Sequence, residues 1–252
     1  MIYVLFLFFT LSIVLFVWYQ AQYFLIFKPT YYREDNDLDE RFEYLEIVSE
    51  DGVKLEGVMY EPSSIKATIL FFGGRSQDSV GAIIKLAQIY PDCRVITFNY
   101  RSYGKSQGVV DEKNLYNDGI HIATIIKKNY GNFLVIGFSL GAVVCGYVTQ
   151  KINVKALILI GAFDSLKKLT KQKYGLSLPF LRYSFSLEDF VKNISSPTYL
   201  FIGKDDVMTY LENGRNLKKE IKNLVFYKEI ADVTHKELLY SKDVIEEVKK
   251  II

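Results

Sequence analysis

A chain of 252 residues is long enough for one sizeable α/β domain or two small ones. Half of its residues are hydrophobic and 24% are charged, which is typical of globular rather than disordered proteins. The formal net charge is only +2 and no long basic block occurs, so we expect no nucleic-acid partner. Cys93 and Cys145 are too few for a disulfide framework and lack metal-ligand spacing, so we expect buried free thiols. With only His121 and His235, a histidine-rich zinc site is excluded.

The first 27 residues contain no charged side chain, and Ile2 to Tyr19 is almost wholly apolar. This run is long enough to cross a bilayer. Trp18, Tyr19 and Tyr23 lie at its far end, and aromatic side chains favour the membrane interface. A cleaved signal peptide fits less well, because no basic region precedes the run and the run exceeds the usual length. We therefore expect residues 1–27 to form an uncleaved single-pass transmembrane anchor.

The anchor is followed by a stretch rich in both signs of charge, and we interpret residues 28–41 as a linker. Lys28, Arg33 and Arg41 lie in it, and the positive-inside rule favours the cytoplasmic side for the domain that follows. Only three bases support this preference, so the opposite orientation stays open. The soluble domain is expected to cover residues 42–252.

The soluble domain opens with alternating apolar and polar residues over 42–49, a turn signal at Asp51-Gly52, and a returning strand over 53–60. This pattern predicts an antiparallel hairpin. From Ala67 onward strands alternate with helices, which predicts a mainly parallel sheet covered by helices on both faces. The expected strands are 67–72, 94–100, 132–137, 154–160, 198–203 and 224–229. The expected helices are 76–90, 111–130, 139–150 and 237–252.

One connection is longer than a tight crossover needs. Residues 162–197 separate two predicted strands and carry many leucine, phenylalanine and tyrosine side chains. Such a segment fits a small lid over a site, and it equally fits an ordinary helix and loop packed on the sheet.

The sequence Gly137-Phe138-Ser139-Leu140-Gly141 has the form of a nucleophile elbow, with a predicted strand before it and a helix after it. The elbow holds the serine on a sharp, strained turn where neighbouring backbones come close together. Side chains at the flanking positions would clash, which is why glycine is needed there. Ser139 is therefore the candidate nucleophile.

A serine hydroxyl needs a base to take its proton and an acid to orient that base. In the elbow architecture the acid and then the histidine follow the serine along the chain. The sole downstream histidine is His235, between the last predicted strand and the last helix. The acid is expected just after the strand 198–203, where Asp206 is our choice and Asp205 the alternative. His121 precedes the elbow inside a predicted helix, and we expect it to be structural.

An oxyanion hole needs two backbone amides that face the developing negative charge. One is expected from Leu140, directly after the nucleophile, and the other from the loop 72–78 after the first buried strand. Gly73 and Gly74 let this loop turn into the site. A phosphate-binding loop is the rival interpretation, but the Walker lysine and the spacing of a dinucleotide motif are both missing.

With these residues the chain resembles the α/β-hydrolase superfamily, and within it the membrane-anchored abhydrolase-domain serine hydrolases. Four stretches, spread over nearly the whole chain after the anchor, carry the resemblance: 71–76, 99–108, 137–141, and 203–206 together with His235. The resemblance implies that Arg75 gives its amide to the oxyanion hole, and that Gly73 stands where the family usually has histidine. Arg75 would place a cation near the site, unless it is an ordinary surface arginine. Ser102 replaces a glycine of the family pattern.

The resemblance implies an α/β-hydrolase fold and a membrane-anchored serine hydrolase of the carboxylesterase, thioesterase or lipase type. Ser139 would attack an acyl ester or thioester, His235 would transfer the proton, and Asp206 would orient the imidazole. No cofactor and no metal is expected. The expected partners are a small acylated or lipidic substrate and the membrane. A serine peptidase on the same fold, or a non-catalytic hydrolase-fold binding protein at the membrane, are the alternatives.

Overall fold

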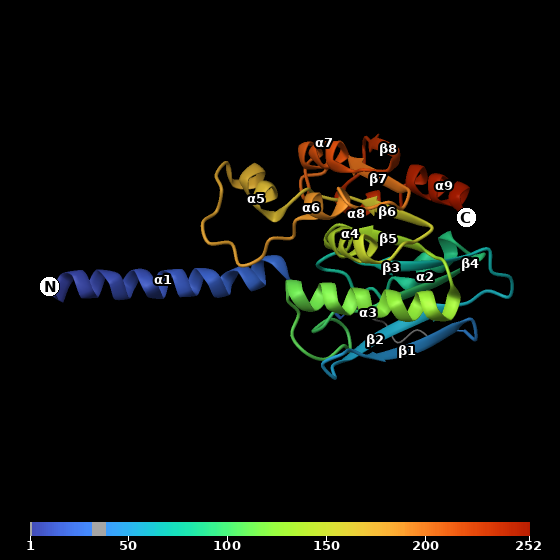
Figure 1. Cartoon of the computed structure of the whole chain (residues 1–252), viewed down its shortest axis with the longest axis horizontal. Helices are drawn as coiled ribbons and strands as arrows, with labels where there is room; N and C mark the ends of the chain where they lie inside the picture. The colour runs from blue at the N-terminus through green and yellow to red at the C-terminus, as the bar shows by residue number, and fades with distance from the viewer. Residues whose placement is uncertain (1, 32–38) are drawn as a thin grey trace.

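The computed structural model describes residues 2–31 and 39–252, which form one sheet flanked by helices (Figure 1). The strand order in the sheet is β1-β2-β4-β3-β5-β6-β7-β8. The strands are β1 Phe42–Val48, β2 Lys54–Tyr60, β3 Ala67–Phe72, β4 Cys93–Phe98, β5 Leu134–Phe138, β6 Ala156–Ile160, β7 Thr198–Gly203 and β8 Leu224–Ile230. The helices are α1 Ile2–Ile26, α2 Ile83–Ile89, α3 Glu112–Tyr130, α4 Leu140–Lys151, α5 Leu166–Tyr174, α6 Leu187–Val191, α7 Leu211–Glu220, α8 His235–Leu238 and α9 Lys242–Ile251.

The sheet is mainly parallel, as predicted. β1 and β2 form the expected antiparallel hairpin, and β2 also pairs antiparallel with β4. All other neighbouring strands run parallel. β5 and β6 are buried along their whole length because helices cover both faces of the sheet. In a parallel sheet the carboxyl ends of the strands meet at one edge, and ligands bind there.

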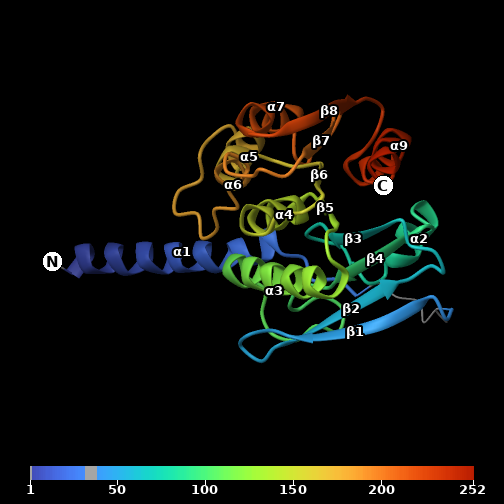
Figure 2. The ribbon, with the colours of Figure 1, turned by 45° about the vertical axis from the view of Figure 1, so that its right-hand side comes forward.

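Helices cover both faces of the sheet (Figure 2), and a separate hydrophobic cluster lies on each face. Side chains of α3, α4, α6 and α7 belong to the cluster on one face. Those of α2, α8 and α9 belong to the cluster on the other. Cys145 lies in the first cluster and Cys93 in the second, and both are buried free thiols, as expected.

Two predicted helices have different boundaries in the structure, and the helix after β7 was not predicted. The helix expected over 76–90 begins only at Ile83, because the preceding residues form turns in which Asn99 Oδ1 accepts the amide of Ser79. The helix expected over 237–252 is two helices, α8 and α9, separated by the extended backbone of Ser241. α7 was not predicted, since its sequence is largely polar and contains Gly214.

The insertion (residues 162–197) divides into two parts. Its second part packs into the core, where Phe185, Leu187, Val191 and Ile194 are buried. Its first part contains α5 and stands at the edge of the sheet beside α1 (Figure 1). The second part thus packs on the sheet as an ordinary helix and loop, and the interpretation of the first part as a lid stays a prediction.

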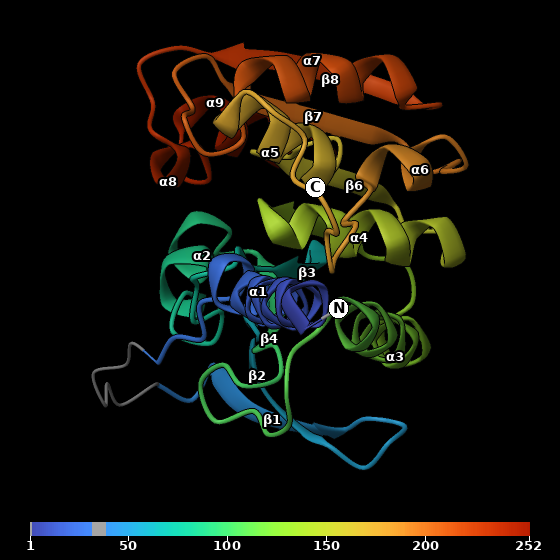
Figure 3. The same cartoon turned by 90° about the vertical axis from the view of Figure 1, so that its left-hand side faces the viewer.

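Helix α1 projects away from the body of the molecule, and only its carboxyl-terminal end meets the domain (Figures 1 and 3). Its apolar side chains before Trp18 are largely exposed. In contrast, Gln22 and Phe27 are buried, and the ring of Phe27 packs edge-on against those of Tyr183 and Phe185. The end of α1 therefore belongs structurally to the domain. Of the predicted linker, residues 32–38 lie outside the described residues.

Candidate active site

Ser139 lies at the carboxyl end of β5, on the turn into α4. Its φ of 54° and ψ of −116° fall in a region that residues with side chains rarely adopt. Such strain costs about 1–3 kcal/mol and is found mainly at functional sites. The amide of Ser139 donates a hydrogen bond to the carbonyl of Ile160 at 2.9 Å, which fixes the turn against β6. The backbone therefore has the sharp strand-to-helix turn that the motif predicts.

The two glycines of the motif are required by close backbone contacts. A Cβ atom on Gly141 would lie 2.1 Å from the carbonyl oxygen of Phe72 and 2.6 Å from that of Gly73. A Cβ atom on Gly137 would lie 2.6 Å from the Cα atom of Ala142. These neighbours are backbone atoms that cannot rotate aside, so a side chain at either position would distort the elbow.

His235 reaches the same edge of the sheet from the loop after β8. Its Nδ1 atom lies 2.6 Å from Oδ2 of Asp206, and its ring centroid lies 4.8 Å from that of Phe138, the neighbour of Ser139. Gly161 makes room for the imidazole, since a Cβ atom there would lie 3.0 Å from Cε1 of His235. In the described part of the chain the hydroxyl of Ser139 forms no hydrogen bond. Catalytic hydrogen bonds of this type often tighten only when substrate binds.

Asp206 is held as a buried, fully hydrogen-bonded carboxylate. It is 4% exposed. Oδ1 accepts the amides of Met208 at 2.7 Å and Thr209 at 3.0 Å, and Oδ2 accepts the Thr209 hydroxyl at 2.7 Å. Burial acts to raise the pKa of Asp206, but the hydrogen bonds from His235 and Thr209 outweigh it and hold the pKa below its ordinary value of 3.8. The carboxylate can therefore orient an imidazolium without becoming protonated at neutral pH.

The other candidate residues lie apart from this pair. Asp205 is exposed, and its Oδ2 accepts the amide of Asp232 at 3.0 Å, so it bridges the loops after β7 and β8. His121 lies on α3, where Nε2 is 3.1 Å from the carbonyl oxygen of Val48. The sequence left Asp205 and Asp206 as candidates for the acid beside the histidine, and in the structure Asp206 is the one that contacts His235.

The position of His235 is set by a helix start. His235 is the first residue of α8, and Thr234 and Glu237 form a capping box around it. Glu237 Oε2 accepts the amide of Thr234 at 2.8 Å, and the Thr234 side chain accepts the amide of Glu237. A capping box satisfies two backbone donors at once and fixes the direction of the chain as it enters the helix. The imidazole is thus presented from a constrained backbone.

Two backbone amides are free to bind an oxyanion. Among the hydrogen bonds of residues 2–31 and 39–252, none has the amide of Leu140 or of Arg75 as its donor. Leu140 is the first residue of α4, where amides have no partner within the helix. The carbonyl of Arg75 is held by the amide of Lys28 at 3.2 Å and the hydroxyl of Tyr103 at 2.5 Å, which fixes the loop after β3.

The loop 99–108 is held by a buried arginine. Arg101 is 5% exposed, and its guanidinium donates two 2.8 Å hydrogen bonds to Asp118 and two, of 2.6 and 2.8 Å, to Asp51. Ser102 adopts a positive φ of 67°, and its hydroxyl donates to the carbonyl of Gly108 at 2.8 Å. Serine can thus occupy the turn where the family pattern has glycine.

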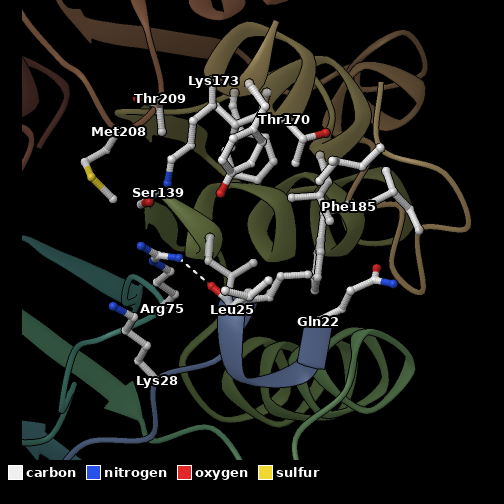
Figure 4. Close-up of a pocket in the computed structure, with 18 of the residues that line it drawn as sticks. Gln22, Leu25, Lys28, Arg75, Ser139, Thr170, Lys173, Phe185, Met208 and Thr209 are labelled. Atoms are coloured by element: carbon white, nitrogen blue, oxygen red, sulfur yellow. Dashed lines mark hydrogen bonds between the residues drawn. The ribbon is translucent and has the colours of Figure 1, made fainter. Parts of the chain in front are cut away.

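A cavity of about 360 Å³ opens beside Ser139 (Figure 4). Much of its wall is apolar and comes from segments far apart in the sequence. Trp18 and Leu25 of α1, Leu169 of α5, and Leu178, Leu181 and Phe185 of the insertion line it. Both α1 and the insertion therefore form part of the site.

Sequence reasoning missed three groups of site residues. Thr209 supports Asp206, and its spacing of three residues is that of a capping motif, so this one was accessible to inspection. Gly161 follows β6 and carries a positive φ, a feature the sequence does not reveal. The wall contributed by α1 was missed because its apolar residues were all assigned to the membrane.

A strained serine after a parallel strand, with a histidine–aspartate pair from two later loops, defines a serine hydrolase of the α/β-hydrolase fold. The chain belongs to the FSH1 serine hydrolase family, whose sequence model matches residues 18–231. The match begins at Trp18, where α1 starts to contact the domain.

Individual proteins agree with this assignment. The chain is 31% identical over 157 residues to the α/β hydrolase domain-containing protein WAV2 of Arabidopsis thaliana, covering 56% of this chain and 48% of that protein. It is 28% identical over 145 residues to the lysophosphatidylserine lipase ABHD12 of Macaca fascicularis, covering 49% of this chain and 36% of that protein. The chain thus spans half or less of the length of these relatives. A solved structure of the Pyrococcus furiosus esterase Pf2001 shares the fold, with a TM-score of 0.72, 19% identity, and coverage of 90% of this chain and 96% of that chain.

Proposed function

We propose that this serine hydrolase is anchored in a membrane by α1 and cleaves the acyl ester or thioester of a lipid-like substrate. The observation that carries the proposal is the position of Ser139 at one end of an apolar cavity whose wall includes the end of α1. An acyl chain drawn from a bilayer would lie in this cavity. The amide and carbonyl groups of a peptide backbone would have no hydrogen-bond partners against this apolar wall.

The anchor is supported by the properties of α1. Among the described residues, α1 is the one helix that is both long enough and apolar enough to cross a membrane. Its 18-residue window has a mean hydropathy of 2.4. None of that window is buried in the protein. Leu176 and Phe180 of the insertion are also exposed. The loop after α5, which contains them, lies on the side from which α1 projects (Figure 1). Exposed apolar groups of this kind favour contact with lipid.

In the proposed mechanism Ser139 Oγ attacks the carbonyl carbon while His235 Nε2 takes the hydroxyl proton. Asp206 holds the proton on Nδ1 and stabilises the imidazolium. The amides of Leu140 and Arg75 bind the oxyanion. The bond to the leaving oxygen or sulfur then breaks, and that atom takes the proton from His235. Water, activated by the same histidine, attacks the acyl-enzyme and releases the fatty acid.

The test uses the full chain in detergent and a fluorophosphonate probe that labels activated serines. We expect labelling of the wild type and none of Ser139→Ala. Hydrolysis of p-nitrophenyl esters should fall by at least about 10³-fold in the variant, since the members of a triad act as a unit. Equal activity of both proteins would refute the proposal. The anchor is tested separately: the protein should stay with membranes after alkaline extraction, and release would show that α1 is not an integral span.

A further inference from the structure

The cavity beside Ser139 is apolar along most of its wall but carries three cations. Among the described residues, the charged side chains that line it are Lys28, Arg75 and Lys173, and none of the described carboxylates lines it. They come from three separate segments: the turn after α1, the loop after β3, and α5. Figure 4 shows all three at the end of the cavity where Ser139 lies, away from Gln22 and Phe185. We call these three residues the cationic mouth.

The charges of the cationic mouth are not neutralised by the described residues. One guanidinium nitrogen of Arg75 donates to the carbonyl of Leu25 at 2.8 Å, and no ion pair involves Arg75, Lys28 or Lys173 in the part of the chain that the structure describes. The ammonium of Lys173 lies 5.3 Å from the ring centroid of Tyr174. By contrast Lys168, on the same helix, is paired with Glu188.

Three cations around one cavity, with no ion-pair partner among residues 2–31 and 39–252, repel each other and create a local positive potential, which an anion would relieve. A phosphate group accepts several charge-assisted hydrogen bonds and suits a combination of arginine and lysine. The cations lie with Ser139 at one end of the cavity, and an apolar channel leads away from them toward Gln22 and Phe185. This arrangement matches an amphiphile whose acyl chain lies in the channel and whose anionic group lies near the scissile carbonyl.

We propose that the cationic mouth binds a phosphate on the leaving-group side of the scissile ester or thioester. This inference rests on the proposed function and adds to it the chemical class of substrate. The acyl chain occupies the channel between α1 and the insertion, and the phosphate contacts Lys28, Lys173 and the guanidinium of Arg75. Arg75 would then act twice, through its amide on the oxyanion and through its side chain on the phosphate. The bonds made and broken are those of the acyl transfer described above.

Two sources present this chemistry: a single-chain glycerophospholipid, and an acyl thioester of coenzyme A. The test compares octanoylglycerol, octanoylglycerol phosphate and octanoyl-coenzyme A, each below its aggregation concentration. The full chain is used in phosphatidylcholine nanodiscs, so that the membrane itself carries no net charge. The variants are Lys28→Gln/Lys173→Gln and, as a control, Lys171→Gln, an exposed lysine on α5 that does not line the cavity.

We expect the wild type to prefer at least one phosphate-bearing substrate over octanoylglycerol by about 10-fold or more in kcat/KM, mainly through KM. The double variant should lower this preference to about 3-fold or less, since Arg75 alone remains, whereas Lys171→Gln should keep it. The preference of the wild type should also fall as salt is added, because the mouth is open to solvent. The favoured substrate identifies the source of the phosphate.

The inference is overturned if the wild type hydrolyses all three substrates equally, or if the double variant retains the preference. Either result leaves the proposed function standing, because neutral ester is still cleaved. If no substrate is cleaved and the fluorophosphonate probe does not label Ser139, the proposed function itself fails. Labelling of the double variant by the same probe confirms that it is folded, so that a lost preference cannot be attributed to misfolding.

Discussion

Gln22 and Arg182 lie 160 residues apart in the sequence, yet Gln22 Oε1 accepts a hydrogen bond from the amide of Arg182 at 2.8 Å. Gln22 Nε2 in turn donates to the carbonyl of Phe180 at 3.0 Å, and the indole of Trp18 donates to that of Pro179 at 3.0 Å. One buried amide side chain on α1 thus pairs with the backbone of the insertion on both sides. These bonds hold α1 and the insertion together around the cavity that contains Ser139.

The substitution Gln22→Leu should loosen the insertion. It leaves the Phe180 carbonyl and the Arg182 amide without their partner, which costs about 1–3 kcal/mol when such groups are buried. We expect faster limited proteolysis within residues 175–186 and weaker discrimination between short and long acyl chains. Gln20→Leu is the matched control: Gln20 is exposed, and among the described residues its side chain accepts a hydrogen bond only from the Arg182 guanidinium, so this variant should behave as the wild type does. Equal proteolysis rates for the two variants would contradict this role of Gln22.

The two adjacent aspartates should differ sharply in activity. Asp206→Asn replaces the acceptor 2.6 Å from His235 Nδ1 and would favour the wrong imidazole tautomer, as the same exchange does in other serine hydrolases. We expect kcat to fall by about 10³- to 10⁴-fold, with folding retained. Asp205→Asn removes only a bond to the Asp232 amide and should lower kcat by about 3-fold at most. Steady-state kinetics on one soluble ester measure kcat for both variants. Similar losses of kcat would mean that Asp206 alone is not the acid that orients His235.

The pH dependence of stability offers an independent check on Asp206. Its pKa in the folded protein lies below the ordinary value of 3.8, so it stabilises the fold above that pH, and this contribution disappears as the pH falls through the folded-state pKa. The difference in unfolding free energy between wild type and Asp206→Asn should therefore shrink between about pH 5 and pH 2. Urea titrations at several pH values would measure it. A difference that grows on acidification would mean that the folded-state pKa is raised.

The elements that the sequence predicted well are those governed by local pattern. Short continuous apolar runs such as 67–72 and 198–203 mark buried strands, and the elbow glycines mark a close backbone contact that leaves no room for a side chain. Hydrophobic periodicity does not reveal two other features. The late start of α2 depends on a hydrogen bond from Ser79 to the distant Asn99, and the break before α9 depends on the extended backbone of Ser241.

The candidate site divides in the same way. Ser139 could be selected because its Gly-x-Ser-x-Gly stretch follows a predicted strand and precedes a predicted helix, and His235 because it is the one histidine downstream of that stretch. The choice of Asp206 over Asp205 needs the three-dimensional position of β8, since both aspartates follow β7 at nearly the same place. The role of α1 as a wall of the cavity could not be predicted, because an apolar helix that crosses a membrane and one that lines a pocket have the same composition.

The elbow should not tolerate even a methyl group at Gly141. Its Cβ atom would lie 2.1 Å from the Phe72 carbonyl oxygen, so α4 or β3 would have to move. We expect Gly141→Ala to cost about 3 kcal/mol or more, and to abolish labelling of Ser139. Gly131→Ala is the control: a Cβ atom there meets nothing within 4 Å, but its backbone, with φ at 75° and ψ at −137°, is unfavourable for alanine. That variant should lose about 1–3 kcal/mol through backbone strain and keep full activity. Thermal or urea unfolding compares the two, and a loss at Gly141 smaller than that at Gly131 would show that small shifts of α4 or β3 relieve the contact.

The strain at Ser139 predicts that this residue lowers the stability of the protein. With φ at 54° and ψ at −116°, any residue with a Cβ atom is unfavourable there, whereas glycine adopts positive φ readily. Ser139→Ala keeps the strain and should have nearly the stability of the wild type, while Ser139→Gly relieves it. Relief of the strain should make Ser139→Gly more stable than Ser139→Ala by about 1–2 kcal/mol. The larger conformational entropy of glycine in the unfolded chain reduces this difference. Both variants lack the hydroxyl and should be inactive, so the comparison separates strain from chemistry. If Ser139→Gly is the less stable of the two, the turn is not strained, and the conformation of Ser139 would have to be explained by the Ile160 hydrogen bond alone.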